Sequence, residues 1–137
     1  MKLALSTWND LVAPVFDVSG TVMVVKISSG RIKTRKSEDI SGMDNLARIN
    51  LLCSLKIEVL VCGAISKPWH DILTAWDIQV ISYVSGKAEE VLRSLLKKNV
   101  NPHKLYMPGC PKSIQDQNLE AIVNINKFNR KVKHQVV

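Results

Sequence analysis

The residues Lys2-Leu3-Ala4-Leu5-Ser6-Thr7-Trp8-Asn9 open the chain with a short apolar run that ends in a polar turn bearing one aromatic residue. The apolar pattern resumes at residues 12–16, where Pro14 disfavours a helix. These two runs predict two short strands before residue 20, and residues 22–27 predict a third. The connections are too short for crossover helices, so the predicted sheet begins with antiparallel pairing.

The next part of the chain predicts one exposed loop and one helix. Residues 28–41 are polar, basic and without a clear apolar period, which is typical of a loop. Ser41 then has the character of a helix cap, and the predicted helix runs to Leu55. The residues that we expect on one face of this helix are Met43, Leu46, Ala47, Ile49, Asn50 and Cys53.

After this helix, strand and helix patterns alternate. Residues 57–62 and 78–84 are short apolar runs that predict strands. Ser66 caps a helix that we expect to run to about Trp76, and Gly86 opens a further helix. The apolar stripe of that last helix consists of Ala88, Val91, Leu92, Leu95 and Leu96. The sequence therefore predicts an α/β domain with a mixed sheet and right-handed crossovers.

The composition of the chain narrows the class of protein to which it can belong. A chain of 137 residues is expected to form one domain with a core of its own. Its three cysteines lack CxxC spacing, so neither a disulfide framework nor a closed zinc site is implied. No apolar stretch approaches the roughly 18 residues that span a bilayer, and the expected location is the cytoplasm. The net charge of +7 is concentrated in residues 26–36 and 127–133.

Five sequence blocks occur in an order that resembles the dinitrogenase iron-molybdenum cofactor biosynthesis family. They are Ala4-Leu5-Ser6-x-Trp8, Pro14-Val15-Phe16-Asp17, Val61-Cys62-Gly63-Ala64-Ile65-Ser66, Val84-Ser85-Gly86 with Glu89-Glu90-Val91-Leu92, and Met107-Pro108-Gly109-Cys110. The resemblance implies a ribonuclease H-like motif fold over residues 1–110, with a five-stranded mixed sheet of order 3-2-1-4-5 flanked by helices. Residues 111–137 would be a basic C-terminal tail or a loosely attached helix.

The same resemblance implies a function without enzymatic chemistry. It predicts the binding, carriage or assembly of an anionic metal-sulfur cluster, either iron-molybdenum, iron-sulfur or molybdenum-copper. Cluster-assembly proteins would then be the partners.

Strand ends indicate where such a cluster would bind. In an open sheet, ligands gather beyond the carboxyl ends of parallel strands, and helix N-termini at that edge attract anions. The cofactor-binding candidates at this edge are Ser6, Trp8, Cys62, Gly63, Ser66, Ser85 and Gly86. The metal-ligand candidates are Cys62, His70 and Cys110, because metal-sulfur clusters accept thiolate or imidazole ligands. Two alternatives without metal binding stay open, namely that Cys62 is an inert buried thiol and that His70 is an ordinary surface residue of its helix.

Other functions have less support in the sequence. A two-metal nuclease needs clustered carboxylates, including one on a central strand, and residues 2–6 contain none. GxSxG, P-loop and GxGxxG motifs are absent, so we expect no enzymatic activity. The alternative function is an interaction or regulatory domain that binds an acidic partner or nucleic acid through the basic loop and tail.

Overall fold

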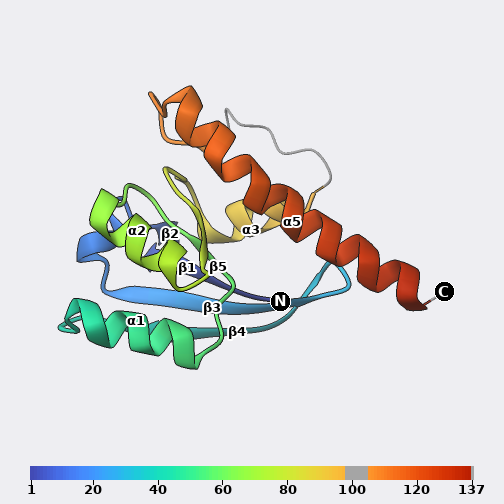
Figure 1. Ribbon diagram of the computed structural model, residues 1–137, viewed down its shortest axis with the longest axis horizontal. Helices are drawn as coiled ribbons and strands as arrows, with labels where there is room; N and C mark the ends of the chain where they lie inside the picture. The colour runs from blue at the N-terminus through green and yellow to red at the C-terminus, as the bar shows by residue number, and fades with distance from the viewer. Residues whose placement is uncertain (98–104, 137) are drawn as a thin grey trace.

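The computed structural model describes residues 1–97 and 105–136, with side chains for residues 1–97 and 105–126. Its elements follow the order β1 (Lys2–Trp8), β2 (Leu11–Val12), η1 (Phe16–Val18), β3 (Thr21–Ser28), β4 (Arg31–Asp39), α1 (Asn45–Ser54), β5 (Val59–Val61), α2 (Lys67–Ala75), β6 (Gln79–Ile81), α3 (Ala88–Leu96) and α5 (Lys112–Val136). The strands form one mixed sheet of order β4-β3-β1-β5-β6, and β2 pairs with β1 beside this path. Helices lie against both faces of the sheet (Figure 1).

The predicted sheet order 3-2-1-4-5 is confirmed, and so is the strand at residues 22–27, which is β3. It takes the second place in this order in place of the strand expected at residues 12–16, and the third place belongs to a strand that was not predicted. Residues 31–39 form β4, which pairs with β3 as an antiparallel hairpin, so the expectation of a loop over residues 28–41 is wrong. This edge strand has polar and charged side chains on both faces, mostly exposed, so its sequence lacks the apolar alternation of a half-buried strand. Of the strand expected at residues 12–16, only Val12 is in a strand, and the chain then turns into η1.

The centre of the sheet is parallel. In the register, Leu5 lies beside Val61, and Val61 lies beside Ile81. All three residues of β5 are buried, as expected for a strand covered on both faces.

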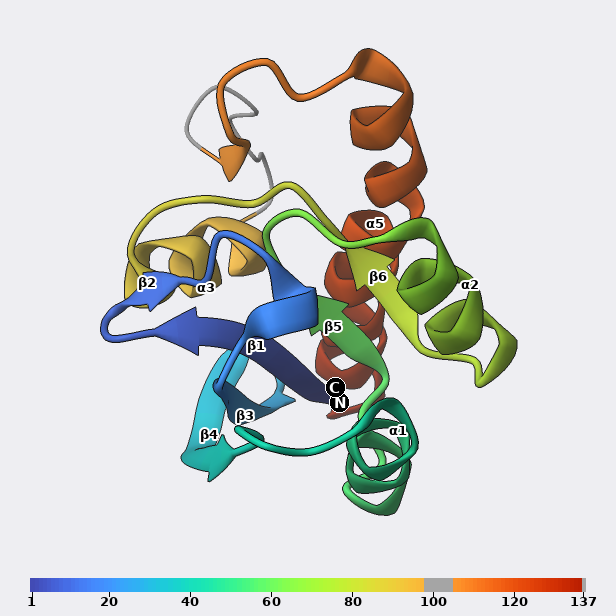
Figure 2. The ribbon, with the colours of Figure 1, turned by 90° about the vertical axis from the view of Figure 1, so that its left-hand side faces the viewer.

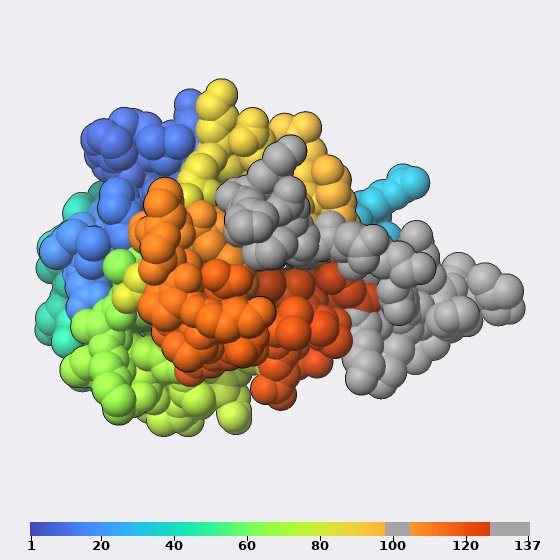
Figure 3. Space-filling model, turned by 90° about the horizontal axis from the view of Figure 1, so that it is seen from above, coloured from blue at the N-terminus to red at the C-terminus, as the bar shows by residue number. Residues whose placement is uncertain are grey.

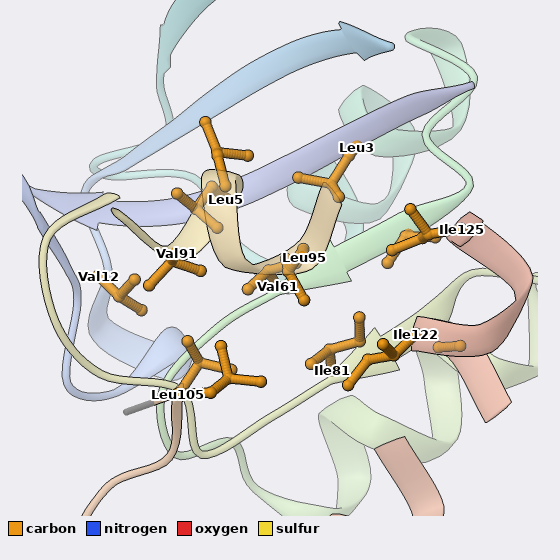
Figure 4. Packing of buried hydrophobic residues seen from close by; sticks show 14 of the residues in the cluster. Leu3, Leu5, Val12, Val61, Ile81, Val91, Leu95, Leu105, Ile122 and Ile125 are labelled. Atoms are coloured by element: carbon orange, nitrogen blue, oxygen red, sulfur yellow. The ribbon is translucent and has the colours of Figure 1, made fainter. Parts of the chain in front are cut away.

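Alternation along the strands sends side chains into two apolar clusters. Leu3, Leu5 and Val61 belong to the cluster covered by α3 and α5, and Figure 4 shows these side chains facing those of Leu95 and Ile122. Ala4, Leu60 and Cys62 point to the other face, where α1 and α2 cover them. The predicted stripe of α3 is confirmed, because Ala88, Val91, Leu92 and Leu95 are buried and Leu96 is partly buried.

Helix α1 begins later and turns a different face inward than predicted. Asp44, not Ser41, caps it, since the Asp44 carboxylate accepts a hydrogen bond of 2.8 Å from the amide of Ala47. The buried residues are Arg48, Ile49 and Leu52, whereas Leu46 is exposed. Arg48 replaces an apolar residue at this helical spacing because buried carbonyl groups accept hydrogen bonds from its guanidinium.

Residues 112–136 form the long helix α5, which lies across one face of the molecule (Figures 2 and 3). Ala121, Ile122 and Ile125 belong to the same core cluster as Leu3 and Leu5, so this part of the helix is firmly packed. The boundary at residue 110 stays a prediction. No helix in residues 1–97 or 105–136 is long and apolar enough to cross a membrane.

Candidate functional site at the carboxyl edge of the sheet

The carboxyl ends of three strands meet at one edge of the sheet. The parallel register of β1, β5 and β6 fixes this arrangement, since Leu5, Val61 and Ile81 lie side by side. The residues that follow these strands, which include the candidates Trp8, Cys62 and Ser85, therefore emerge at the same edge. The two ends formed by β5 and β6 differ in how they are covered.

The end of β5 is closed by residues 13–18, which we call the covering segment. The amide of Phe16 donates to the carbonyl of Ala64, and the amide of Ala64 donates to the carbonyl of Pro14, both at 2.8 Å. Gly63 lies so close beneath this segment that a Cβ there would be 2.4 Å from the carbonyl oxygens of Ala13 and Pro14. Only glycine fits at this position.

Two charged residues hold the covering segment in place. The carboxylate of Asp17 accepts a hydrogen bond of 3.0 Å from the amide of Ser66, at the N-terminus of α2. The guanidinium of Arg48 donates to the carbonyl oxygens of Phe16 at 3.0 Å and Ser19 at 2.7 Å. Burial lowers the pKa of Arg48, and the nearby charge of Asp17 partly offsets this effect. The N-terminus of α2 thus already has a carboxylate beside it, which satisfies part of its attraction for anions.

Ser6 and Cys62 lie side by side beneath the covered end. Both are fully buried, and strand alternation with the parallel register places them on the same face of the sheet. The hydroxyl oxygen of Ser6 has no hydrogen-bond partner among the residues that the structure describes. Burial, and to a smaller extent the charge of Asp17, raises the pKa of the Cys62 thiol. This environment is that of an inert thiol, and solvent does not reach it.

The chain beyond β6 pairs with Tyr106 at Val84 and with Leu105 at Ser85. Within the part of the chain that the structure describes, a basic pocket lies beside this pairing, and we call it the open end of β6. A pocket of about 450 Å³ begins at Ser85 and Gly86 and continues along α3. Among the described residues, three cations and one carboxylate, that of Glu90, line it; the cations are Lys87, Arg93 and Lys97. Sequence reasoning found Ser85 and Gly86 but missed these cations. The available signal was the spacing of four residues between Arg93, in the last turn of the helix, and Lys97, directly after its end.

The N-terminus of α3 also has acidic groups of its own. Glu89 and Glu90 lie in its first turn, and Glu89 forms an ion pair of 2.9 Å with Arg35 of β4. The amide of Ala88 donates to the carbonyl of Asp10 at 2.8 Å. Attraction of an anion to this pocket therefore rests on the side-chain cations more than on the amides and the helix dipole.

Trp8 lies at the same edge with 61% of its surface exposed. It borders a separate apolar pocket of about 340 Å³, together with Pro14, Val15 and Val18. The structure does not place Trp8 among the residues that line the basic pocket.

The three predicted metal ligands lie apart. His70 faces α5, where its Nε2 is 3.3 Å from Nε2 of Gln117, and it borders a groove of about 570 Å³. Cys110 lines a different pocket of about 540 Å³, and Cys62 is in the core. Within residues 1–97 and 105–126, no three His, Cys, Asp or Glu side chains are grouped as a metal site.

No protein-family model matches the sequence, and no curated protein is significantly similar to it. Solved structures share the fold. The protein PH0822 superposes with a TM-score of 0.69 at 16% identity, over 80% of this chain and 96% of that one. The protein MJ0327 of Methanocaldococcus jannaschii is provisionally described as a dinitrogenase. Its crystal structure gives a TM-score of 0.61 at 15% identity, over 81% of this chain and 97% of that one. Its NMR structure gives a TM-score of 0.59 at 18% identity, over 81% and 95%. The chain therefore has the fold of these proteins, as its resemblance to the cofactor biosynthesis family implied.

Proposed function

We propose that this protein binds an anionic metal-sulfur cluster without catalysing a reaction, as a carrier or assembly accessory. The observation that carries the proposal is the basic pocket at the open end of β6, where three cations line the same pocket as Ser85 and Gly86. The fold supports it, because a protein described as a dinitrogenase has the same arrangement of strands and helices. Cluster-assembly proteins would deliver and receive the cargo.

Charge and size both suit such a ligand. The three cations exceed the single carboxylate of Glu90 by two charges, so the pocket attracts a bulky anion. Arg and Lys donate hydrogen bonds, and cluster sulfides accept them. Its volume of about 450 Å³ falls within the range of ordinary ligand pockets. Binding through cations alone is reversible, which suits a protein that passes its cargo on.

The test is anaerobic loading with separate probes: tetrathiomolybdate, and iron or copper with sulfide. Retained metal is measured by elemental analysis and the visible spectrum after desalting. The decisive variant is the triple substitution Lys87→Gln, Arg93→Gln, Lys97→Gln. Its matched control is Arg31→Gln, Lys33→Gln, Lys36→Gln, which removes the same residue types from the exposed strand β4. We expect stoichiometric retention in wild type and in the control, and loss of retention in the pocket variant.

Two results would contradict the proposal. Wild-type protein that stays colourless and free of metal with every probe has no such site. Equal loss of retention in both triple variants would show that the anion responds to overall charge and that the pocket at β6 has no special role.

A second function is favoured by β4 itself. Its exposed residues include Arg31, Lys33, Arg35 and Lys36, so a basic edge strand faces solvent where a loop was expected. This surface suits an acidic protein partner or a nucleic acid. The β4 triple variant separates the two functions, since it should weaken binding of an RNA or DNA oligonucleotide and reduce its salt dependence while cluster retention stays unchanged. Unchanged oligonucleotide binding by this variant would exclude nucleic-acid recognition through β4.

A further inference from the structure

Strand β6 ends the sheet on the side opposite β4, and part of its outer edge is unpaired. Its inner edge pairs with β5, where the Gln79 amide donates to the carbonyl of Glu58 at 3.0 Å. Successive residues of a strand direct their backbone groups to opposite edges of that strand. The N–H and C=O groups of Val80, and those of Ser82 just after the strand, therefore point outward.

These two outward-pointing residues meet different surroundings. At Ser82, the side chain of Asn118 acts as a neighbouring strand would, since it accepts a hydrogen bond of 3.1 Å from the amide and donates one of 2.8 Å to the carbonyl. At Val80, neither the N–H nor the C=O group has a hydrogen-bond partner among residues 1–97 and 105–126. Val80 is a buried residue, and a backbone group without a partner is unfavourable there. The edge can thus accept a strand at this residue.

A groove of about 570 Å³ follows the unpaired edge, and Val80 is part of its lining. Helix α2 contributes Thr74 to one wall and α5 contributes Gln117 to the other. Figure 2 shows β6 between these two helices. A strand added to a sheet lies about 4.8 Å from its neighbour, so an extended peptide in this groove would come within hydrogen-bonding distance of Val80.

The groove is acidic although the chain as a whole is basic. Its lining includes the carboxylates of Glu58, Asp77 and Glu120, and none of the Lys or Arg side chains that the structure describes. Met1 also borders it, but its ammonium donates to the carbonyl of Ile27 at 2.9 Å. The net charge of +7 repels cations from the molecule at long range, so a basic ligand would be attracted by the local field of the groove.

We propose that the groove beside β6 binds an extended basic peptide of a partner protein, which adds to the sheet as a strand next to Val80. The peptide backbone donates a hydrogen bond to the Val80 carbonyl and accepts one from its amide. Arg or Lys side chains of the peptide pair with the carboxylates of Asp77 and Glu120. This surface is distinct from the basic pocket, and the proposal does not rest on cluster binding there.

The first test measures hydrogen exchange of backbone amides in the full chain by NMR, with the peptide acetyl-Lys-Val-Arg-Val-Lys-amide as the probe. In the free protein, the amide of Val80 should exchange at least about tenfold faster than that of Gln79, which is bonded to β5. Saturation with the peptide should slow exchange at Val80 at least about tenfold and leave Gln79 unchanged.

The second test compares affinities by NMR titration at low salt. The same peptide with N-methyl groups on its three central amides keeps its charges but loses hydrogen-bond donors, and it should bind at least about tenfold more weakly. The double variant Asp77→Asn, Glu120→Gln should weaken binding of the unmodified peptide about fivefold. Its matched control is Asp10→Asn, Glu38→Gln, which changes the same residue types outside the groove and should bind like wild type.

Several results would overturn the proposal. Exchange at Val80 as slow as at Gln79 in the free protein would show that the edge is already protected. Equal binding of the N-methylated peptide would show attraction by charge without strand pairing, and equal loss in both double variants would show a response to overall charge. Protection of Val80 that grows with protein concentration, without peptide, would identify a second copy of this chain as the occupant. Cluster retention by the basic pocket is measured separately, so either proposal can fail alone.

Discussion

The ends of β5 and β6 are neighbours at one edge of the sheet, and each pairs with a distant segment, yet the residues after β5 are buried whereas those after β6 line a basic pocket. Both strands have three residues and run parallel to each other. Beyond β5, residues 13–18 form backbone hydrogen bonds with Ala64 and cover Ser6 and Cys62. Beyond β6, the chain passes Gly86 into a pocket lined by three cations. The burial after β5 comes from a segment more than forty residues earlier in the sequence, so a strand end alone does not determine whether a ligand reaches it.

The largest expected effect is at the closed end. Gly63→Ala places a Cβ against two backbone carbonyl oxygens of the covering segment, and we expect a loss of at least about 4 kcal/mol in the free energy of unfolding. Urea denaturation measures this loss. Gly20→Ala is the control, since its nearest contact is at 3.7 Å, and it should be nearly neutral. A small effect of Gly63→Ala would mean that the covering segment moves aside readily and that the end of β5 is not closed.

The next effect concerns the charged residue that holds the segment. Arg48→Met removes two hydrogen bonds. The Phe16 carbonyl keeps the hydrogen bond from the Ser19 amide, but the buried Ser19 carbonyl loses its donor, at a cost of about 2 kcal/mol. In the native state, the Cys62 thiol should then react faster with a disulfide reagent. The exposed Arg31→Met is the control and should change neither quantity. Unchanged Cys62 labelling in Arg48→Met would show that the segment closes without Arg48.

The third prediction concerns the pH dependence of stability that arises from the Cys62 thiol at the closed end. Burial raises the pKa of the Cys62 thiol above its ordinary value of 9.0. As pH rises past about 9, the unfolded chain loses this proton first, so stability is full below that pH and falls above it. The slope from one such group is about 1.4 kcal/mol per pH unit. Urea midpoints between pH 7 and 10 should fall less steeply for Cys62→Ala than for wild type. Val61→Ala, which titrates no group, should keep the wild-type slope; equal slopes in all three proteins would contradict the buried thiol.

The smallest effect is expected at the open end. Glu90→Gln removes the one carboxylate of the basic pocket, so the affinity for tetrathiomolybdate should rise about twofold at low salt and return to the wild-type value at high salt. Equilibrium dialysis at two salt concentrations measures it. Glu120→Gln, in the groove beside His70, is the control with the same charge change. A rise in both variants would indicate that the open end has no local preference for anions.

Whether an element could be predicted from the sequence depends on how much of it packs against the core. The helices at residues 67–75 and 88–96 and the strands at 59–61 and 79–81 were predicted because their apolar patterns are packed into the core. Strand β4 was missed because it is exposed on its outer edge and carries charged side chains on both faces. A single sequence indicates buried strands through the regular alternation of apolar residues. An edge strand that pairs with only one neighbour and is mostly exposed shows little of this alternation.

For the candidate site, the sequence predicted the edge of the sheet at which it lies. Sequence patterns located the strand ends that include Ser85 and Gly86, since turns after apolar runs are visible in the sequence. The closure of the β5 end depends on Arg48 reaching carbonyl groups of residues 16 and 19, across about thirty residues of sequence. Such a contact has no local pattern. Cys62 was therefore a reasonable candidate by position and became a core residue through a distant segment.

The long helix α5 is hydrogen-bonded to the residue that follows β6, and this contact has a consequence for self-association. The Asn118 side chain accepts a hydrogen bond of 3.1 Å from the amide of Ser82 and donates one of 2.8 Å to its carbonyl, as a neighbouring strand would. Beside Ser82, just after β6, a neutral amide thus takes the place of a strand neighbour, whereas the other margin of the sheet, β4, is protected by its charged side chains. Salt weakens only the second kind of protection. Self-association of the folded protein in concentrated salt should therefore begin at β4.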